Sequence, residues 1–373
     1  MAASSPALGV IPLSLKAAQL KRLSFLCGLP VGGRKEELIA RLTAANNTPP
    51  PPPARSSSGP VVLSIDLGIR NLAFSLLTPA TPSTLASRKA GTKSKKQSSA
   101  NQSLPLLYTR PPTIKLHAWQ RLSLLDGTIN GSAQNGDVNA SDVDPLTGAF
   151  TPAALAKTAN AFLQETVLQL KPLPTHILIE RQRWRSGGAA AVQEWTLRVN
   201  TLEAMLHASL RTLRDLRAWK GEVVSVRPEL AGPFFLDADK LDTGDAAQNK
   251  VVKGDKIDAS GTKSKGKRKS SAEAKKLKID LLGHWIGQGD LVVGPSNVEA
   301  GHMLEAYRDV FQGIKSGKSK RIVGEREAEK KPVTLDKKLD DLTDSLLQGM
   351  AWLRWQENLA LLRQDNGVEQ LLK

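Results

Sequence analysis

The fold is decided by the stretch Val61-Val62-Leu63-Ser64-Ile65-Asp66-Leu67-Gly68-Ile69-Arg70-Asn71-Leu72-Ala73-Phe74-Ser75. The apolar and β-branched residues before Asp66 predict a strand buried on both faces. Gly68 suits a sharp turn into a second apolar strand. A carboxylate in such a run is costly to bury unless it is paired or binds a metal. Asp66 is therefore a candidate functional carboxylate at a hairpin.

Two further places combine a carboxylate with a buried element. Thr175-His176-Ile177-Leu178-Ile179-Glu180 predicts a second buried strand that ends in one acid. Asp340-Asp341-Leu342-Thr343-Asp344 opens a strong helix predicted over 339–362, in which positions three and four apart share a face. If the strands are neighbours and the helix packs across them, all these carboxylates converge. One of Asp340 and Asp341 is then surplus, because the two point about 100° apart.

Such a cluster of carboxylates cannot stay ionised without a counter-charge. Oxygen-only ligands select Mg²⁺, for which Mn²⁺ can substitute. Two such ions roughly 4 Å apart can activate a water and stabilise the leaving oxygen of a phosphodiester. We therefore expect two ions at a hydrolytic site for nucleic acid. Part of the cluster also fits simple capping, because the helix dipole favours acids in the first turn.

Composition narrows the classes of partner. Lys and Arg number 52 against 36 for Asp and Glu, which gives a net charge of +16 and favours a polyanionic partner such as nucleic acid. Lysines in 253–278 supply much of this excess. The single cysteine, Cys27, excludes a disulfide framework and a thiolate zinc cluster. No apolar run is long enough to span a bilayer, so we expect no membrane association.

The chain divides into a small N-terminal unit and one large domain. Residues 13–43 predict two amphipathic helices around a glycine turn, and 44–59 form a Pro/Ser-rich linker. The main domain covers 60–373, with polar inserts at about 78–105, 126–147 and 237–272. Within it the patterns predict further strands over 114–122 and 222–226, and helices over 151–170, 193–219 and 275–286. Trp195 and the apolar positions from Leu197 to Leu213 are expected in the core.

The order of hairpin with Asp, strand with Glu and late helix with Asp resembles the ribonuclease H-like superfamily. The segments 64–73, 179–187 and 337–347 resemble the fungal mitochondrial Holliday junction resolvases, the RuvC-like cruciform-cutting enzymes. The unit at 13–43 resembles the SAP motif, a two-helix DNA-binding module. These resemblances imply an α/β fold with a mixed five-stranded sheet flanked by helices. A small N-terminal helical SAP-like arm would precede it on a flexible tether.

The resolvase resemblance also implies a function and its residues. It implies a mitochondrial homodimer, without nucleotide cofactor, that binds a four-way DNA junction and nicks two opposed strands symmetrically with Mg²⁺. Asp66, Glu180, Asp341 and Asp344 carry over as the catalytic, metal-binding acids, with Asp340 as a substitute or extra ligand. Family members often have Lys-Lys-Asp-Asp-Leu where Leu339 intervenes here, which leaves the register of the pair open. The expected DNA contacts are Arg181, Gln182, Arg183, Arg185, Lys337, Lys338, Lys16, Lys21, Arg22, Arg34 and Lys35.

Three alternatives remain beside this interpretation. An actin- or heat-shock-type ATPase shares the Asp-x-Gly turn, but the second glycine-rich phosphate loop of that fold is not found. A non-catalytic SAP and ribonuclease H-like DNA-binding protein is disfavoured by the retention of all the acids. A ribonuclease H for hybrids, or a transposase relative, is disfavoured by the basic run after Glu180. Trp184 in that run either stacks on an exposed base or belongs to the core.

Overall fold

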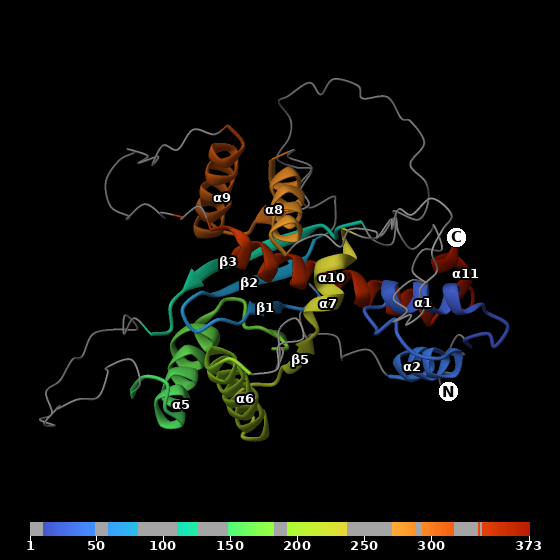
Figure 1. Ribbon diagram of the computed structural model, residues 1–373, viewed down its shortest axis with the longest axis horizontal. Coiled ribbons are helices and arrows are strands. Elements are labelled where there is room, and N and C mark those ends of the chain that lie inside the picture. The colour runs from blue at the N-terminus through green and yellow to red at the C-terminus, as the bar shows by residue number, and fades with distance from the viewer. Residues whose placement is uncertain are drawn as a thin grey trace, which may run out of the picture.

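The computed structural model describes residues 10–48, 59–80, 110–125, 148–182, 192–236, 271–287, 293–316, 335 and 338–373. Its centre is a six-stranded sheet in the order β5-β4-β1-β2-β3-β6 (Figure 1). The strands are β1 (Val62–Asp66), β2 (Leu72–Pro79), β3 (Ile114–Leu122), β4 (His176–Glu180), β5 (Glu222–Val226) and β6 (Val293–Pro295). Strands β1 to β3 form an antiparallel meander, β4 and β5 extend it parallel to β1, and β6 runs parallel to β3.

The structure confirms the mixed sheet flanked by helices, but the sheet has six strands instead of the expected five. The additional strand, β6, is three residues long and pairs with the start of β3. A segment this short cannot display the alternation by which strands are recognised in a sequence. The predicted bounds of 114–122 and 222–226 coincide with those of β3 and β5.

Helices cover both faces of the sheet, as Figure 1 shows. The pair α5 (Pro152–Ala161) and α6 (Glu194–Asp215) lies on one face, and α10 (Asp340–Leu362) crosses the other. Two more helices, α8 (Ser271–Gly287) and α9 (Val298–Ser316), pack beside α10. The remaining helices are α1 (Ala17–Leu26), α2 (Lys35–Asn47), α7 (Pro228–Phe234) and α11 (Gly367–Leu372). None of the helices in the described ranges is long and apolar enough to cross a bilayer.

Alternation along β1 divides the core in two. Leu63 and Ile65 are buried in a cluster with residues of α5 and α6. Val62 is buried in the opposite cluster, and Ser64 contacts α10 on that same side. Successive strand residues point to opposite faces, so Asp66, two residues beyond Ser64, lies on the α10 side.

The N-terminal helices are packed into the main core. The fully buried Leu20, Leu23, Leu38 and Leu42 of α1 and α2 belong to the same cluster as Leu359 and Leu362 of α10. The side-chain amide of Asn358 donates to the Leu26 carbonyl over 2.7 Å. Arg363 donates to the carbonyls of Ala45, Asn46 and Thr48, the last of which follows α2. The sequence predicts an arm on a tether, whereas the structure fixes this helical pair on the end of α10.

Several other expected bounds shift by a few residues. Thr151 caps α5 as predicted, since its hydroxyl accepts from the Ala154 amide over 3.3 Å. The helix predicted over 151–170 is α5 followed by a π-helical turn at Phe162–Thr166 and a 3₁₀ turn at Val167–Gln169. Residues 44–47 belong to α2, 78–79 end β2 and 271–272 start α8. The rest of the linker and of the three polar inserts lies almost wholly outside the described residues.

The start of α6 departs from the expected core. Trp195 and Leu197 are 40% and 45% exposed, although Val199, Leu202, Leu206 and Leu210 of the same helix are buried. Trp195 packs edge-on against Phe150, with ring centres 5.8 Å apart, and Arg70 lies 5.8 Å from its ring centre. Apolar spacing identifies the face of a helix, but it does not tell how far along the helix that face is covered.

We predict that Leu23→Ala, in α1, lowers the stability of the whole domain. The leucine is completely buried in the core shared with α10, so its loss should cost about 2–5 kcal/mol of unfolding free energy. Urea denaturation followed by tryptophan fluorescence should show one transition that shifts to lower urea. Lys16→Ala, at an exposed position, is the control. An unchanged main transition would mean that the helical pair folds separately.

Candidate active site

Hydrogen bonds to successive strands hold α10 across the sheet. The Trp119 indole of β3 donates to the Leu342 carbonyl over 3.0 Å, near the start of α10. The Ser75 hydroxyl of β2 donates to the Ser345 carbonyl, also over 3.0 Å. Both acceptors are backbone carbonyls of the helix, so these contacts fix its height above the sheet and its position along the strands.

Gln348 fixes the register between α10 and β1. Its side-chain amide donates to the Ser64 hydroxyl over 3.1 Å and to the Ile65 carbonyl over 3.2 Å. Asp344 lies one turn before Gln348, which is about 6 Å of helix. Asp66 lies two residues beyond Ser64, which is about 6.6 Å of strand. Because these two steps are nearly equal, Asp344 is brought opposite Asp66.

A glycine lets the helix come this close. A Cβ atom added at Gly349 would lie 2.7 Å from Leu77 Cδ2 and 3.2 Å from Ser64 Cβ. The first distance is shorter than real Cβ contacts allow, so a larger residue would require Leu77 or the helix itself to move. Gly349 thus permits close packing of α10 on β1 and β2.

Asp66 and Glu180 end two neighbouring parallel strands. Ile65 pairs with Ile179, so the two acids are the next residues on the same edge of the sheet. Burial raises the pKa of the Asp66 carboxyl well above its usual range, and the charge of Glu180 and a hydrogen bond with it raise it further. The charges of Asp344 and Asp341 act in the same direction. The carboxyls of Glu180, Asp341 and Asp344 therefore lie within electrostatic reach of Asp66, and we call the four residues the acid cluster.

The structure separates Asp340 from its neighbour. Asp340 accepts from the Lys275 ammonium over 2.8 Å; burial opposes the charged carboxylate, but this hydrogen bond holds its pKa below the usual range. Burial raises the pKa of Asp341, and the neighbouring charge of Asp340 adds to this. The charge of Asp341 raises the pKa of Asp66, whereas that of Asp340 raises the pKa of Asp341 and of Asp344. Asp341 thus acts on the strand-end carboxyl, and Asp340 is held by Lys275.

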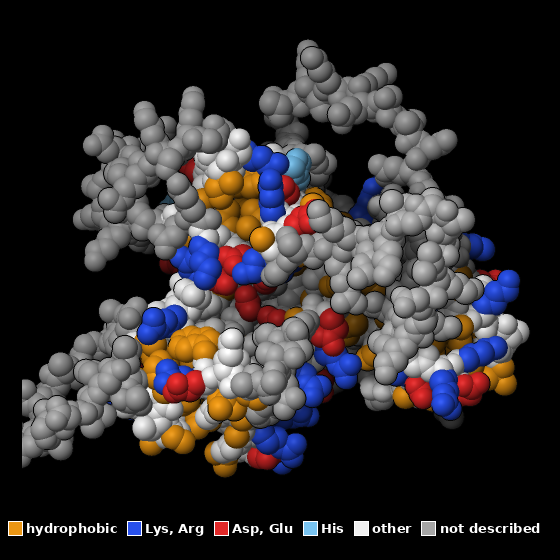
Figure 2. Space-filling view, in the orientation of Figure 1, with side chains coloured by type: hydrophobic (Ala, Val, Ile, Leu, Met, Phe, Trp, Pro, Cys, Tyr) orange, Lys and Arg blue, Asp and Glu red, His pale blue; other side chains and the backbone are white. Residues whose placement is uncertain are grey.

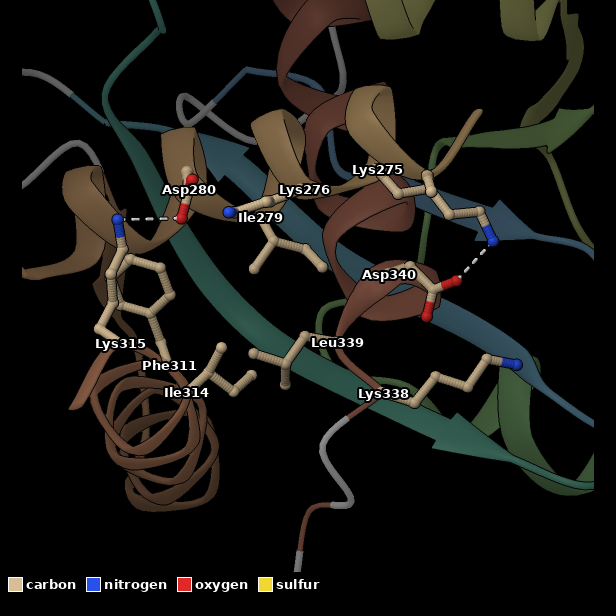
Figure 3. Close-up of a pocket in the computed structure, with 11 residues that line it drawn as sticks. Lys275, Lys276, Ile279, Asp280, Phe311, Ile314, Lys315, Lys338, Leu339 and Asp340 are labelled. Carbon is tan, nitrogen blue, oxygen red and sulfur yellow. Dashed lines mark hydrogen bonds and ion pairs between the residues drawn. The ribbon is translucent and has the colours of Figure 1, made fainter. Parts of the chain in front are cut away.

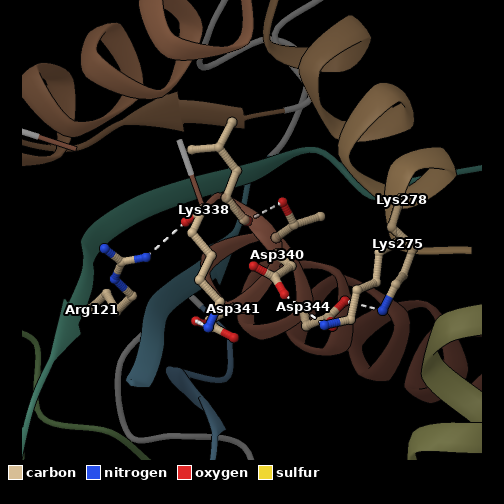
Figure 4. A network of polar contacts seen from close by, with 9 residues as sticks. Arg121, Lys275, Lys278, Lys338, Asp340, Asp341 and Asp344 are labelled. Atoms are coloured by element: carbon tan, nitrogen blue, oxygen red, sulfur yellow. Dashed lines mark hydrogen bonds and ion pairs between the residues drawn. The ribbon is translucent and has the colours of Figure 1, made fainter. Parts of the chain in front are cut away.

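Lysines face the aspartates of α10, as Figure 4 shows. Lys278 of α8 pairs with Asp344 at short range, one helical turn beyond the pair of Lys275 and Asp340. The Lys338 ammonium lies 3.6 Å from Asp341 Oδ2. Burial raises the pKa of Asp344 in spite of the Lys278 ammonium. The pairs therefore neutralise the cluster only in part.

The donor set of the acid cluster fits a hard divalent cation. In the ranges that the structure describes, no group of three or more His, Cys, Asp or Glu residues is placed so that it could hold a metal ion. The chemistry nevertheless matches, because every donor is a carboxylate oxygen and Mg²⁺ prefers such ligands. One oxygen, Oδ2 of Asp341, is buried without a hydrogen-bond partner. A cation would satisfy that oxygen and would stabilise the ionised form of Asp66.

The expected DNA-binding residues lie in several places. Arg181 is exposed at the end of β4, with its amide bound to the Val226 carbonyl over 2.7 Å. Gln182 is bound within the protein itself: its backbone amide donates to Glu203 Oε2 over 3.0 Å, and its side-chain amide donates to the carbonyls of Leu67 and Glu180 over 3.5 and 3.4 Å. Lys338 adjoins the acid cluster, whereas Lys337, Arg183 and Arg185, together with Trp184, lie outside the described residues. The N-terminal set of Lys16, Lys21, Arg22, Arg34 and Lys35 lies on or beside α1 and α2, at the far end of α10.

A cleft of about 600 Å³ adjoins the acids (Figure 3). It lies between α8, α9 and the start of α10, with Ile279, Phe311, Ile314 and Leu339 as its apolar lining. The ammonium groups of Lys275, Lys276, Lys315 and Lys338 stand around it. Figure 2 shows acidic side chains near the start of α10 with basic side chains beside them, in the middle of the visible face. Acidic side chains at the start of α10 and basic side chains around the cleft thus lie on one surface.

Several residues that position the acids were not predicted from the sequence. Besides Trp119 and Gln348, the Tyr307 hydroxyl of α9 pairs with the Thr343 hydroxyl over 2.7 Å. Arg121 donates to the Lys338 carbonyl over 2.8 Å. Only Gln348 had a local signal, because it is a polar residue one turn after Asp344 on an otherwise apolar face. The other contacts join segments that are far apart in the chain.

Comparison with known proteins adds a family to this geometry. The family model described as "Mitochondrial resolvase Ydc2 / RNA splicing MRS1" matches residues 62–362. That range includes every strand and the whole acid cluster. The chain belongs to this resolvase family. Membership agrees with the resemblance to mitochondrial resolvases and argues against the ATPase alternative.

Individual members of the resolvase family are distant. The mitochondrial cruciform cutting endonuclease 1 of Schizosaccharomyces pombe is 29% identical over 195 residues, which cover 52% of this chain and 55% of that protein. The match therefore spans about half the length of this relative. The solved yeast mitochondrial Holliday junction resolvase Ydc2 is 23% identical, with 95% of this chain and 98% of that chain covered and a TM-score of 0.49. For the fowlpox virus resolvase in complex with Holliday junction DNA, identity is 13%, coverage is 80% and 98%, and the TM-score is 0.29.

We predict that Asp66→Asn stabilises the protein in EDTA and that the gain grows with pH. The folded-state pKa of Asp66 lies above its unfolded value, so the native state binds more protons and loses stability as pH rises between the two values. Asparagine removes this loss, and the melting temperature at pH 8 should rise by roughly 2–4 °C relative to wild type. Thermal melts at pH 5 and pH 8 measure the effect, with the exposed Asp365→Asn as control. Equal melting temperatures of wild type and Asp66→Asn at both pH values would contradict the electrostatic account.

Proposed function

We propose that this chain is a Mg²⁺-dependent endonuclease that resolves four-way DNA junctions by paired, symmetric nicks. The observation that carries the proposal is the convergence of the acid cluster: strand-end Asp66 and Glu180 meet Asp341 and Asp344 of a helix from the far end of the chain. Nothing in a structural core requires four mutually repelling carboxyls, and burying them costs stability. Family membership supports the same reaction.

The acid cluster would supply the ligands, with Asp66 and Glu180 from the sheet and Asp341 and Asp344 from α10. When bound, two Mg²⁺ ions, or Mn²⁺ in their place, supply an activated water and charge stabilisation for the leaving oxygen. The chain's own part is to hold the carboxylates in place through α10 and to offer Lys338 and Arg181 to phosphates. Cleavage is then expected to leave a 5′-phosphate and a 3′-hydroxyl.

The proposal also includes a homodimeric state and a mitochondrial location. A homodimer would place two sites on opposed strands of one junction, and the exposed Trp195 and Leu197 at the start of α6 give apolar surface for such an interface. Mitochondrial location is supported by the names of the relatives. The basic residues of the SAP-like pair would bind a duplex arm beyond the crossover.

A second candidate is nucleic-acid binding without cleavage. The description of the family also names an RNA splicing protein, so its members are not all described as resolvases. The retained acid cluster favours the nuclease, because a binding protein gains nothing from carboxylates that repel phosphates.

We expect the two adjacent aspartates of α10 to differ in their effect on cleavage. Asp341→Asn should abolish nicking of a synthetic four-way junction in Mg²⁺, a loss greater than the roughly 10–100-fold cost of losing an outer-shell partner. Asp340→Asn should retain much of the activity, because Asp340 is paired with Lys275 away from Asp66. Glu180→Gln should behave as Asp341→Asn while still binding the junction.

Linear duplex and RNA–DNA hybrid substrates, each with Mg²⁺ and with EDTA, complete the assay. Wild-type protein that binds the junction but never cuts it would support the second candidate. Preference for the hybrid would indicate a ribonuclease H. Cutting by Asp341→Asn at the wild-type rate would show that the site assignment is wrong.

A charge reversal tests the N-terminal pair without removing its core leucines. Lys16→Glu with Arg34→Glu changes two exposed residues, and it should weaken junction binding. If both contact phosphates, the slope of log affinity against log salt should flatten by about 2. Lys157→Glu, exposed on α5 at the other end of the molecule, is the control. An unchanged slope in the double variant would mean that the pair has only a structural role.

A further inference from the structure

Two ion pairs join α8 to α10, and their spacings match on the two helices. Lys275 and Lys278 lie three residues apart on α8, and their partners Asp340 and Asp344 lie four apart on α10. Both spacings place side chains on one face of a helix. Two successive turns of one helix thus meet two successive turns of the other, as Figure 4 shows.

The two pairs differ in their surroundings. Lys275 is 51% exposed, and its partner Asp340 is not a member of the acid cluster, although its charge reaches Asp344. Lys278 is only 17% exposed, and its partner Asp344 is a member of the cluster. A lysine so far removed from water is costly unless its partner compensates for the lost hydration. Lys278 is therefore paired with a carboxylate of the acid cluster. Lys275 forms an ion pair that joins α8 to α10 outside that cluster.

A divalent cation and the Lys278 ammonium would compete for the same carboxylate. Both are positive, and at a few ångströms in a partly buried site they repel each other strongly. We propose that Lys278 is the internal counter-ion of Asp344: it occupies the carboxylate in the metal-free protein and is displaced when the cation binds. This inference rests on the proposed function, because it takes the acid cluster to be the cation site.

The ion pair of Lys278 with Asp344 would hold the acid cluster in place in the metal-free protein. Without a positive partner, Asp344 would be pushed away from Asp66 and Asp341, and the first turn of α10 would lose its position. With the ammonium in place, α8 holds that turn against the strand ends. The neighbouring pair of Lys275 and Asp340, one helical turn away, lines the cleft between α8, α9 and the start of α10.

Linkage gives the consequence that can be measured. If cation binding must displace the ammonium, the ion pair weakens cation binding by some factor. Removal of the ammonium must then tighten cation binding by that factor. Lys278→Met keeps most of the apolar stem and removes the charge. We expect the Mg²⁺ dissociation constant of this variant to fall about tenfold, which lies within the range usual for coupled sites. Lys278→Arg retains the charge and should resemble the wild type.

The test is isothermal titration of the full chain with Mg²⁺ and with Mn²⁺, without DNA. Lys276→Met is the matched control, because Lys276 stands on the same helix, is exposed, and has no carboxylate partner among the described residues. Thermal melts add a second readout. In EDTA, Lys278→Met should melt below wild type, since the partly buried Asp344 loses its ion pair. Saturating Mg²⁺ should stabilise the variant more than it stabilises wild type.

The outcomes separate this inference from the proposed function. Tighter Mg²⁺ binding by Lys278→Met, with Lys276→Met and Lys278→Arg unchanged, supports it. If the wild type binds Mg²⁺ and cuts junctions, but Lys278→Met binds Mg²⁺ equally or more weakly, the inference is overturned and the proposed function stands. Absence of Mg²⁺ binding and of cutting in every variant overturns both.

Discussion

The structure depends on the contact of one helix, α10, with buried polar groups of three central strands. Gln348 bonds to Ser64 and Ile65, and Trp119 and Ser75 bond to carbonyls of the helix. These are buried, directional contacts, and an unmet partner in any of them would carry a desolvation cost. They therefore hold the helix in one register, and the positions of Asp341 and Asp344 follow from that register.

The acid cluster shows the balance that such sites require. Its carboxyls destabilise the metal-free fold, as the raised pKa of Asp66 shows. The surrounding structure compensates through the close packing at Gly349 and through the ammonium groups of α8. Local strain of this kind is found at functional sites because the rest of the fold can sustain it.

Much of this architecture was predictable from the sequence, because it rests on local patterns. The bounds of β3 and β5 follow from apolar alternation, and Asp66 and Glu180 stand at strand ends that their apolar runs announce. The phase of the last helix indicated that one of Asp340 and Asp341 is surplus. Which one is surplus depended on where α10 sits on the sheet, and that is set by contacts between residues more than two hundred positions apart.

Other features had no local signal. The strand β6 is too short, and α7 contains Pro233 within its seven residues. The exposure of Trp195 depends on which elements reach the start of α6. The docking of α1 and α2 depends on Asn358 and Arg363, which carry no pattern that points to the N-terminus. The proline run suggested a separate arm, whereas the buried leucines of both helices belong to the same core as residues of α7, α10 and α11.

The unbroken length of α10 has one more consequence. Its 23 residues carry Asp341 and Asp344 at one end and the Asn358 contact with the N-terminal helices towards the other. A single residue inserted between Asp344 and Asn358 would rotate one end by about 100° against the other. Either the carboxylates or the seat of α1 would then turn away from its partner. The number of residues in this helix between Asp344 and Asn358 is therefore constrained from both ends.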